Sequence, residues 1–139
     1  MYAFDLTTEN SPGLDPTTSV SADGKTVLFR KQPRGGDPNE FAATIPIDGG
    51  RPETVKMPFP AGEVSSFKFH PDGKSILFLR QDENGVGNIW SVRRDGKGLQ
   101  QITHFDSQAI LGFDLSSANQ LVISRGSRVR DVVFIKKLK

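Results

Sequence analysis

The sequence predicts an all-β chain built from short antiparallel sheets that recur along its length. Two segments, S-V-S-A-D-G-K-T-V-L-F from residue 19 and K-F-H-P-D-G-K-S-I-L-F from residue 68, place Asp-Gly-Lys before an apolar run. Their aspartates, Asp23 and Asp72, lie 49 residues apart, and a second pair of Asp-Gly corners, at Asp48 and Asp95, lies 47 residues apart. A period of about 45 residues made only of β-type segments is typical of four-stranded β-propeller blades.

A third, altered copy of the repeat runs from Asp114 to Ser124 and reads D-L-S-S-A-N-Q-L-V-I-S. It begins 46 residues after its counterpart, and Ala118-Asn119 replaces the Asp-Gly corner. We therefore predict a single partial β-propeller over residues 1–139, with about three blades at approximately 17–56, 64–103 and 110–136.

Each blade is expected to begin with a hairpin, because Asp-Gly between apolar runs is a strong hairpin signal: glycine accepts a positive φ and aspartate tolerates it. The run Ser75–Leu79 is almost wholly apolar, which suits a strand covered on both faces. The predicted strands are Thr17–Ser21, Thr26–Arg30, Phe41–Ile47 and Pro52–Lys56, then Val64–Phe69, Ser75–Arg80, Asn88–Arg93 and Leu99–Thr103, then Leu111–Leu115, Leu121–Arg125 and Asp131–Lys136.

The number of blades is too small for a closed ring, because propellers typically close with about four to eight blades. The chain is therefore expected to belong to a longer protein or to assemble with a second copy into a six-bladed ring. Residues 1–6 alternate as a strand does. They are either a closing strand added to the last blade of a neighbouring copy or the remnant of a truncated upstream blade.

Composition excludes several classes of function. The 139 residues include no cysteine and only two histidines, so disulfides and thiolate chemistry are excluded and a histidine-rich metal site is not expected. The net charge of +2 gives no reason to expect nucleic acid as a partner. No run approaches the roughly 18 apolar residues of a membrane span, and residues 1–10 lack the pattern of a signal peptide, which leaves the compartment open.

The segments Phe69-His70-Pro71-Asp72-Gly73-Lys74 and Asn88-Ile89-Trp90 through Asp95-Gly96 resemble the TolB-like, WD40-like propeller repeats. The resemblance covers nearly the whole chain and implies a propeller fold. The tail from Phe113 to Lys139 resembles the last blade of C-terminal propellers in bacterial multidomain proteins that carry a kinase or a winged-helix domain upstream. This chain itself has neither the glycine-rich phosphate loop nor the His-Arg-Asp loop of a kinase.

Catalytic and metal sites are not predicted. His70 lies in a hairpin corner, His104 in a connection between blades, and no Gly-x-Ser-x-Gly elbow accompanies them. The loop Asp82-Glu83-Asn84-Gly85 has a weak likeness to a calcium loop, but the twelfth position, where glutamate is required, is Arg93. We therefore predict no cofactor and interpret this loop as a plain hairpin connection.

Binding is the predicted role. The longest insertion is the loop over residues 31–40, and long loops on rigid scaffolds often carry function. In propellers the loops after each second strand and between blades gather on one face. The binding candidates on or near it are Arg34, Asp37, Asp82, Glu83, Arg125 and Arg128.

Two aromatic residues, Phe41 and Trp90, are assigned matching positions in their blades and are expected to pack between blades. The basic C-terminal stretch, which contains Arg125 and Arg128, is interpreted as a solvated edge strand. The leading hypothesis is a non-catalytic module that binds a protein or peptide. The alternatives are an accessory or sensor domain of a larger bacterial enzyme or regulator, and a propeller hydrolase.

Overall fold

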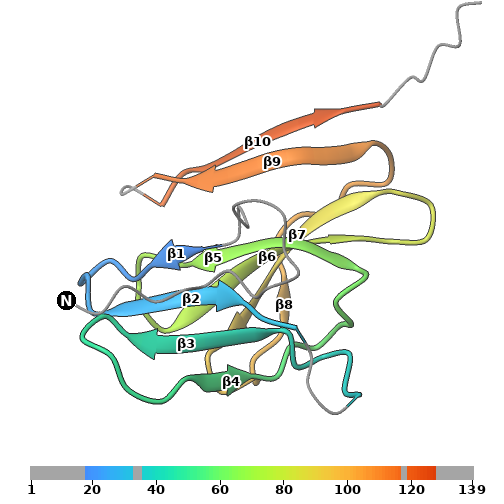
Figure 1. The fold of residues 1–139 in the computed structure, drawn as a ribbon. Coiled ribbons are helices and arrows are strands. Elements are labelled where there is room, and N and C mark those ends of the chain that lie inside the picture. Colours follow the sequence, from blue (N-terminus) through green and yellow to red (C-terminus); the bar gives the residue numbers. More distant parts are fainter. Residues whose placement is uncertain (1–17, 33–35, 117–118, 128–139) are drawn as a thin grey trace, which may run out of the picture.

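Three antiparallel sheets follow one another along the chain in the computed structural model, which describes residues 18–32, 36–116 and 119–127 (Figure 1). The first sheet contains, in spatial order, β1 (Ser19–Val20), β2 (Thr26–Arg30), β3 (Ala42–Pro46) and β4 (Glu53–Val55). The second contains β5 (Val64–Phe69), β6 (Ser75–Gln81), β7 (Gly87–Arg93) and β8 (Gln100–Gln101). The third contains β9 (Ala109–Leu115) and β10 (Leu121–Gly126).

The sequential strand order within each sheet is the arrangement of propeller blades, so the predicted all-β fold class is confirmed. Strands β2 and β5 have the predicted bounds, and β6 and β10 run one residue further than predicted. Strands β1, β4 and β8 are shorter than expected, with two, three and two residues, whereas β9 begins earlier than predicted, at Ala109. The strand predicted over Asp131–Lys136 and the candidate strand 1–6 lie outside the described residues.

The Asp-Gly corners all use the same backbone geometry. The amide N–H of Gly24 donates to the carbonyl of Ser21 at 2.8 Å, and that of Gly73 donates to His70 at 3.0 Å. Both glycines have a φ near +70°, at 73° and 69°, which explains why glycine occupies the corner. In the third copy Asn119 takes this place with a φ of 60°, as asparagine can, and the hairpin forms without a glycine.

The third corner is one residue shorter than the other two, which corrects the predicted alignment. The His70 amide bonds to the carbonyl of Ser75, five residues on, whereas the Ser116 amide bonds to Gln120, four residues on. Lys68 pairs with Leu77, and its counterpart Asp114 pairs with Val122. Equivalent residues of the second and third copies are therefore 46 positions apart before this corner and 45 positions apart after it. Arg125 consequently corresponds to Arg80.

Two apolar clusters hold the sheets together. The first joins the first and second sheets and contains Leu28, Phe41, Ala42, Val55, Met57, Val64, Phe67, Phe69, Ile76, Phe78 and Val92. The second joins the second and third sheets and contains Leu77, Leu79, Ile89, Ile110 and Phe113. Alternate side chains of β6 thus enter different clusters, because successive residues of a strand point to opposite faces.

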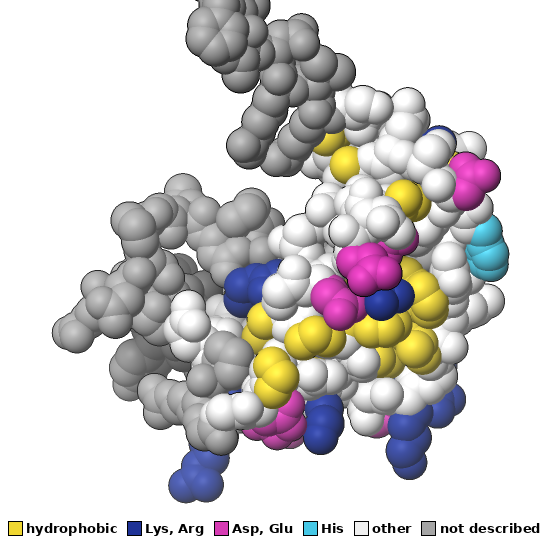
Figure 2. All heavy atoms as spheres, turned by 90° about the vertical axis from the view of Figure 1, so that its right-hand side faces the viewer, with side chains coloured by type: hydrophobic (Ala, Val, Ile, Leu, Met, Phe, Trp, Pro, Cys, Tyr) yellow, Lys and Arg dark blue, Asp and Glu magenta, His cyan; other side chains and the backbone are white. Residues whose placement is uncertain are grey.

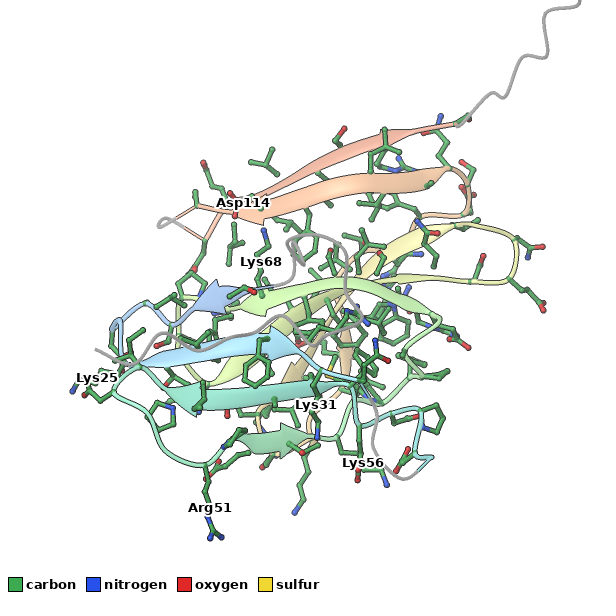
Figure 3. All side chains as sticks on the ribbon, viewed as in Figure 1. Lys25, Lys31, Arg51, Lys56, Lys68 and Asp114 are labelled. Carbon is green, nitrogen blue, oxygen red and sulfur yellow. The ribbon has the colours of Figure 1, made fainter. Side chains whose placement is uncertain are left out.

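The first strands of neighbouring sheets are also linked by polar contacts. The Phe69 amide donates to Ser19 Oγ at 3.2 Å. At the corresponding position of the next sheet, the Lys68 ammonium donates to the Phe113 carbonyl at 2.8 Å and lies 3.4 Å from Asp114 Oδ1 (Figure 3). Within the described part of the chain no helix is present that is long and apolar enough to cross a membrane.

Candidate binding face

Four loops form one side of the molecule, and we call this side the loop face. They are the described parts of the β2–β3 loop (residues 31–32 and 36–41), the β4–β5 loop (56–63), the β6–β7 loop (82–86) and the β8–β9 loop (102–108). Hydrogen bonds join them in pairs: Asn39 Nδ2 donates to the Met57 carbonyl at 2.8 Å, and the Gly87 amide at the start of β7 donates to Gln108 at 3.1 Å. The right-hand side of Figure 1, which Figure 2 presents to the viewer, is this face.

Asp37 holds the β2–β3 loop against the β4–β5 loop. Its carboxylate accepts the Asn39 amide at 3.0 Å and lies 3.4 Å from Lys56 Nζ. These contacts, the backbone hydrogen bond first, hold the pKa of Asp37 below its ordinary value. Asp37 therefore serves the fold of its own loop. Arg34, the neighbouring candidate, lies outside the described residues.

Asp82 and Glu83 lie in the exposed β6–β7 loop. Asp82 Oδ1 accepts the amides of Asn84 and Val86, each at 2.9 Å, so this oxygen closes the hairpin loop. Glu83 makes no hydrogen bond or ion pair within the described ranges. Of the two, Glu83 is the one whose carboxylate is not used by the fold.

Arg125, at the end of β10, lies against the β8–β9 loop. Its guanidinium carbon is 3.5 Å from the centre of the Phe105 ring, and Nη2 donates to the Ser107 carbonyl at 2.6 Å. Its Nε is buried and has no hydrogen-bond partner among the described residues. Arg125 is therefore mainly a packing residue, and Arg128 lies outside the described residues. The described candidates share the loop face but do not contact one another in a single cluster.

Arg80 and Phe59 carry a contact that the sequence analysis missed. The Arg80 guanidinium lies 3.9 Å over the Phe59 ring, and its Nε donates to Glu63 Oε2 at 2.8 Å. Phe59 in turn meets the edge of Trp90, with ring centres 5.2 Å apart. The signal was present in the repeat, because Phe59 corresponds to Phe105 at 46 residues and Arg80 corresponds to Arg125 at 45.

Phe41 and Trp90 do not occupy matching positions, contrary to the prediction. Phe29 pairs with Ala43 in the first sheet, and Phe78 pairs with Trp90 in the second, so Trp90 corresponds to Ala43. Phe41 does pack between sheets, with its ring centre 6.0 Å from that of Phe67. Trp90 is half-buried at the margin of the same cluster.

Two open hollows indent the loop face. One, of about 410 Å³, is lined by Gly62, Glu63, Arg80, Gln81, Asp82 and Glu83. The other, of about 680 Å³, is lined by Ser65, Gln81, Asn84, Gly85, Gln108, Ala109, Gly126 and Ser127. They adjoin at Gln81. The predicted residues Asp82 and Glu83 thus line the first hollow, next to the Arg80 side chain.

The histidines are not arranged as in a serine hydrolase. His70 Nδ1 accepts the Asp72 amide at 3.0 Å, and the Ser75 hydroxyl donates to Asp72 Oδ2 at 3.3 Å. Asp72 Oδ2 also lies 3.3 Å from His70 Nδ1, so the carboxylate stands between the hydroxyl and the imidazole, whereas a triad requires the imidazole between the other two groups. His104 is exposed in the β8–β9 loop.

Neither a family model nor a curated protein matches the sequence. Solved structures do match. The chain is similar to a putative TolB from Agrobacterium tumefaciens, with a TM-score of 0.62 and 23% identity over 89% of this chain and 42% of that one. It is also similar to TolB from Acinetobacter baumannii, with a TM-score of 0.60 and 21% identity over 80% of this chain and 26% of that one.

The fold is that of TolB-like β-propeller blades. A tricorn protease is a further structural neighbour, with a TM-score of 0.52 and 14% identity over 93% of this chain and 13% of that one. The chain spans less than half the length of each of these three proteins. Because a protease is among the neighbours of these TolB-like blades, likeness of fold does not decide between binding and catalysis.

Proposed function

We propose that the chain is a non-catalytic propeller module that binds a protein or peptide through its loop face. The observation that carries this proposal is the pair of adjoining hollows, which are lined mainly by polar residues. The smaller lies between the β4–β5 and β6–β7 loops, and the larger lies between the second and third sheets. Loops held on a rigid β-scaffold are a frequent place for recognition.

The test is an unbiased peptide-display selection against the full chain, followed by measurement of the selected peptides on surface variants. We expect Asp82→Ala and Glu83→Ala to weaken binding, because both side chains line the smaller hollow. The matched control is Asp95→Ala, at the β7–β8 corner, where the side chain is exposed. Arg34→Ala tests the sequence-based candidate in the long loop. Selected peptides that bind all four variants as well as the unaltered chain would contradict a role for this face.

Self-assembly is a second proposal, and it is supported by an uncovered apolar surface on the third sheet. Val122 of β10 is 63% exposed and Leu111 of β9 is 52% exposed, whereas the neighbouring Leu121 and Ile123 pack towards the second sheet. A further blade would cover this surface, and a second copy of the chain could supply it in a six-bladed ring. Sedimentation equilibrium should then give a dimer that Val122→Ser weakens. A strict monomer at micromolar concentration would exclude the ring.

The accessory-domain alternative differs from the first proposal in what the module serves rather than in how it binds. In that case the loop face would contact another domain of a larger bacterial enzyme or regulator. The reading frame around the coding sequence tests this directly. A kinase or winged-helix domain encoded in the same frame would support it.

A further inference from the structure

The smaller hollow of the loop face combines negative charge with an aromatic pair beside its one arginine. Its lining contains the carboxylates of Glu63, Asp82 and Glu83 and the single guanidinium of Arg80. Formal charges therefore sum to a negative value here, although the whole chain has a net charge of +2. The hollow is thus a local negative region on a weakly basic protein, and such a region attracts cationic groups.

The charges of the hollow are only partly neutralised by the fold. Glu63 Oε2 accepts Arg80 Nε at 2.8 Å, so these two groups are paired. Asp82 Oδ1 accepts hydrogen bonds from the Asn84 and Val86 amides. Because an amide N–H carries no net charge, these bonds do not neutralise the carboxylate. Glu83 is exposed and has no polar partner among the described residues. Two carboxylates, Asp82 and Glu83, therefore remain available to an incoming cation.

An aromatic pair, Phe59 and Trp90, adjoins the hollow through its contact with Arg80, which lines it. The Arg80 guanidinium covers the Phe59 ring at 3.9 Å, and Phe59 meets Trp90 with ring centres 5.2 Å apart. Both aromatic side chains are only half-buried. Figure 2 shows the result: hydrophobic side chains gather around acidic ones and a basic one in the middle of this face.

We propose that this hollow receives an arginine or lysine side chain of an extended peptide, while an adjacent apolar residue of that peptide packs beside Arg80, on the parts of Phe59 and Trp90 that remain exposed. The inference rests on the proposed function and names the chemistry of its partner. Charge complementarity selects the cation, and half-buried aromatic rings are the surfaces that recognition sites use as anchors. A metal ion is a poorer fit, because no group of three or more ligand-type side chains in the described residues is arranged to hold one.

The experiment compares three synthetic octapeptide pools that share randomised flanks beside a fixed phenylalanine and differ in one residue: arginine, glutamine or glutamate. Binding to the full chain is measured by fluorescence anisotropy. We expect the arginine pool to bind best and the glutamate pool to bind worst. Because the charged groups are exposed, added salt should lower the affinity of the arginine pool for the chain. This affinity is measured between about 0.05 and 0.5 M ionic strength.

Two double variants locate the site. Asp82→Asn with Glu83→Gln removes the two available charges but keeps the oxygen that closes the loop. We expect binding of the arginine pool to fall about three- to tenfold. Asp48→Asn with Glu53→Gln makes the same charge change on the first sheet, at exposed residues away from the hollow, and should leave binding unchanged.

The outcomes separate this inference from the proposed function. Equal binding of the three pools, or an equal loss with both double variants, would overturn the cation site. If the glutamate or glutamine pool binds best and Asp82→Asn with Glu83→Gln alters that binding, the loop face still binds peptides and only the partner chemistry is wrong. If no pool binds at all, the inference fails, and the display selection decides the proposed function independently.

Discussion

The interface between the first two sheets and the interface between the second and third are made from copies of one repeat, yet they differ in composition. The first buries several aromatic side chains, among them Phe41, Phe67 and Phe78, and all three are almost wholly inaccessible to solvent. The second has a smaller buried cluster, in which Phe113 is the single aromatic member and is 9% exposed.

Both interfaces nevertheless keep the same contact at the loop face. An arginine at the end of the second strand lies over a phenylalanine of the preceding loop, as Arg80 over Phe59 and as Arg125 over Phe105. A polar acceptor holds each arginine in place: the carboxylate of Glu63 for Arg80 and the carbonyl of Ser107 for Arg125. The difference teaches that the repeat preserves the loop-face contact more closely than it preserves the volume of the core.

The largest expected effect comes from truncating the aromatic core of the first interface. Phe78 is 0% exposed, so Phe78→Ala should lower the free energy of unfolding by about 3–5 kcal/mol. Phe113→Ala should cost less, because Phe113 retains contact with solvent and its neighbours can collapse more easily. Urea denaturation followed by tryptophan fluorescence measures both. The comparison would be broken if the two substitutions destabilised the chain equally.

A glycine at the second interface gives the next effect. A Cβ on Gly87 would lie 2.7 Å from the backbone nitrogen of Ile110, so the second and third sheets would have to move apart. We expect Gly87→Ala to cost about 1–3 kcal/mol, by the same chemical denaturation measurement. Gly62→Ala is the matched control, because open space surrounds that position. Equal stability of the two variants would mean that the second interface accommodates the added methyl group without loss of stability.

Removal of the stacked arginines should have a smaller effect. Arg80→Met keeps much of the apolar stem but removes the guanidinium, and it should lower the free energy of unfolding by about 1 kcal/mol. Arg125→Met should act similarly if the two contacts are equivalent. Arg51→Met is the control, since Arg51 is exposed. Thermal unfolding of the three variants compares the interfaces directly, and a loss confined to Arg80→Met would show that the stacks are not equivalent.

The smallest effect concerns acid pH. The amide of Leu115, followed by the Lys68 ammonium, lowers the pKa of Asp114, so the folded chain binds this proton less readily than the unfolded chain does. The resulting stabilisation is present above the unfolded pKa, about 3.9, and is lost as pH falls through the lower folded value. Asp114→Asn should therefore flatten the loss of stability below about pH 4. Denaturation midpoints of the Asp114→Asn variant and the unaltered chain across this pH range measure the difference, and parallel curves would contradict the prediction.

Much of this fold follows from local sequence signals. The Asp-Gly corners at Asp23 and Asp72 placed the hairpins, and the apolar run after each corner gave β2 and β6 nearly to the residue. The candidate residues Asp37, Asp82, Glu83 and Arg125 were likewise chosen from their expected positions in or near loops, and their role in binding stays a prediction. These signals lie within a few residues of one another, which is why they can be recognised without knowing what packs against them.

The parts that were missed depend on contacts between distant segments. The corner at Asn119 is shorter by one residue, and this is visible in the pairing of Asp114 with Val122 and in the hydrogen bond from Ser116 to Gln120. The correspondence of Trp90 with Ala43 is likewise a matter of register. Because side chains alternate across a strand, a shift of one residue exchanges the faces, and the sequence pattern does not record which register the partner strand selects.

The sequence by itself determined that this chain repeats, that its repeats are antiparallel sheets, four-stranded in the first two copies, and where most strands begin to within one residue. Tertiary structure decided which loop residues serve the fold and which remain available. Asp37 and Arg125 are engaged by neighbouring loops, whereas Glu83 has no polar partner among the described residues, and Arg80 joins the loop face through its position over Phe59. The physical reason is that a side chain's partners are set by segments that are distant in sequence and become neighbours only when the sheets stack.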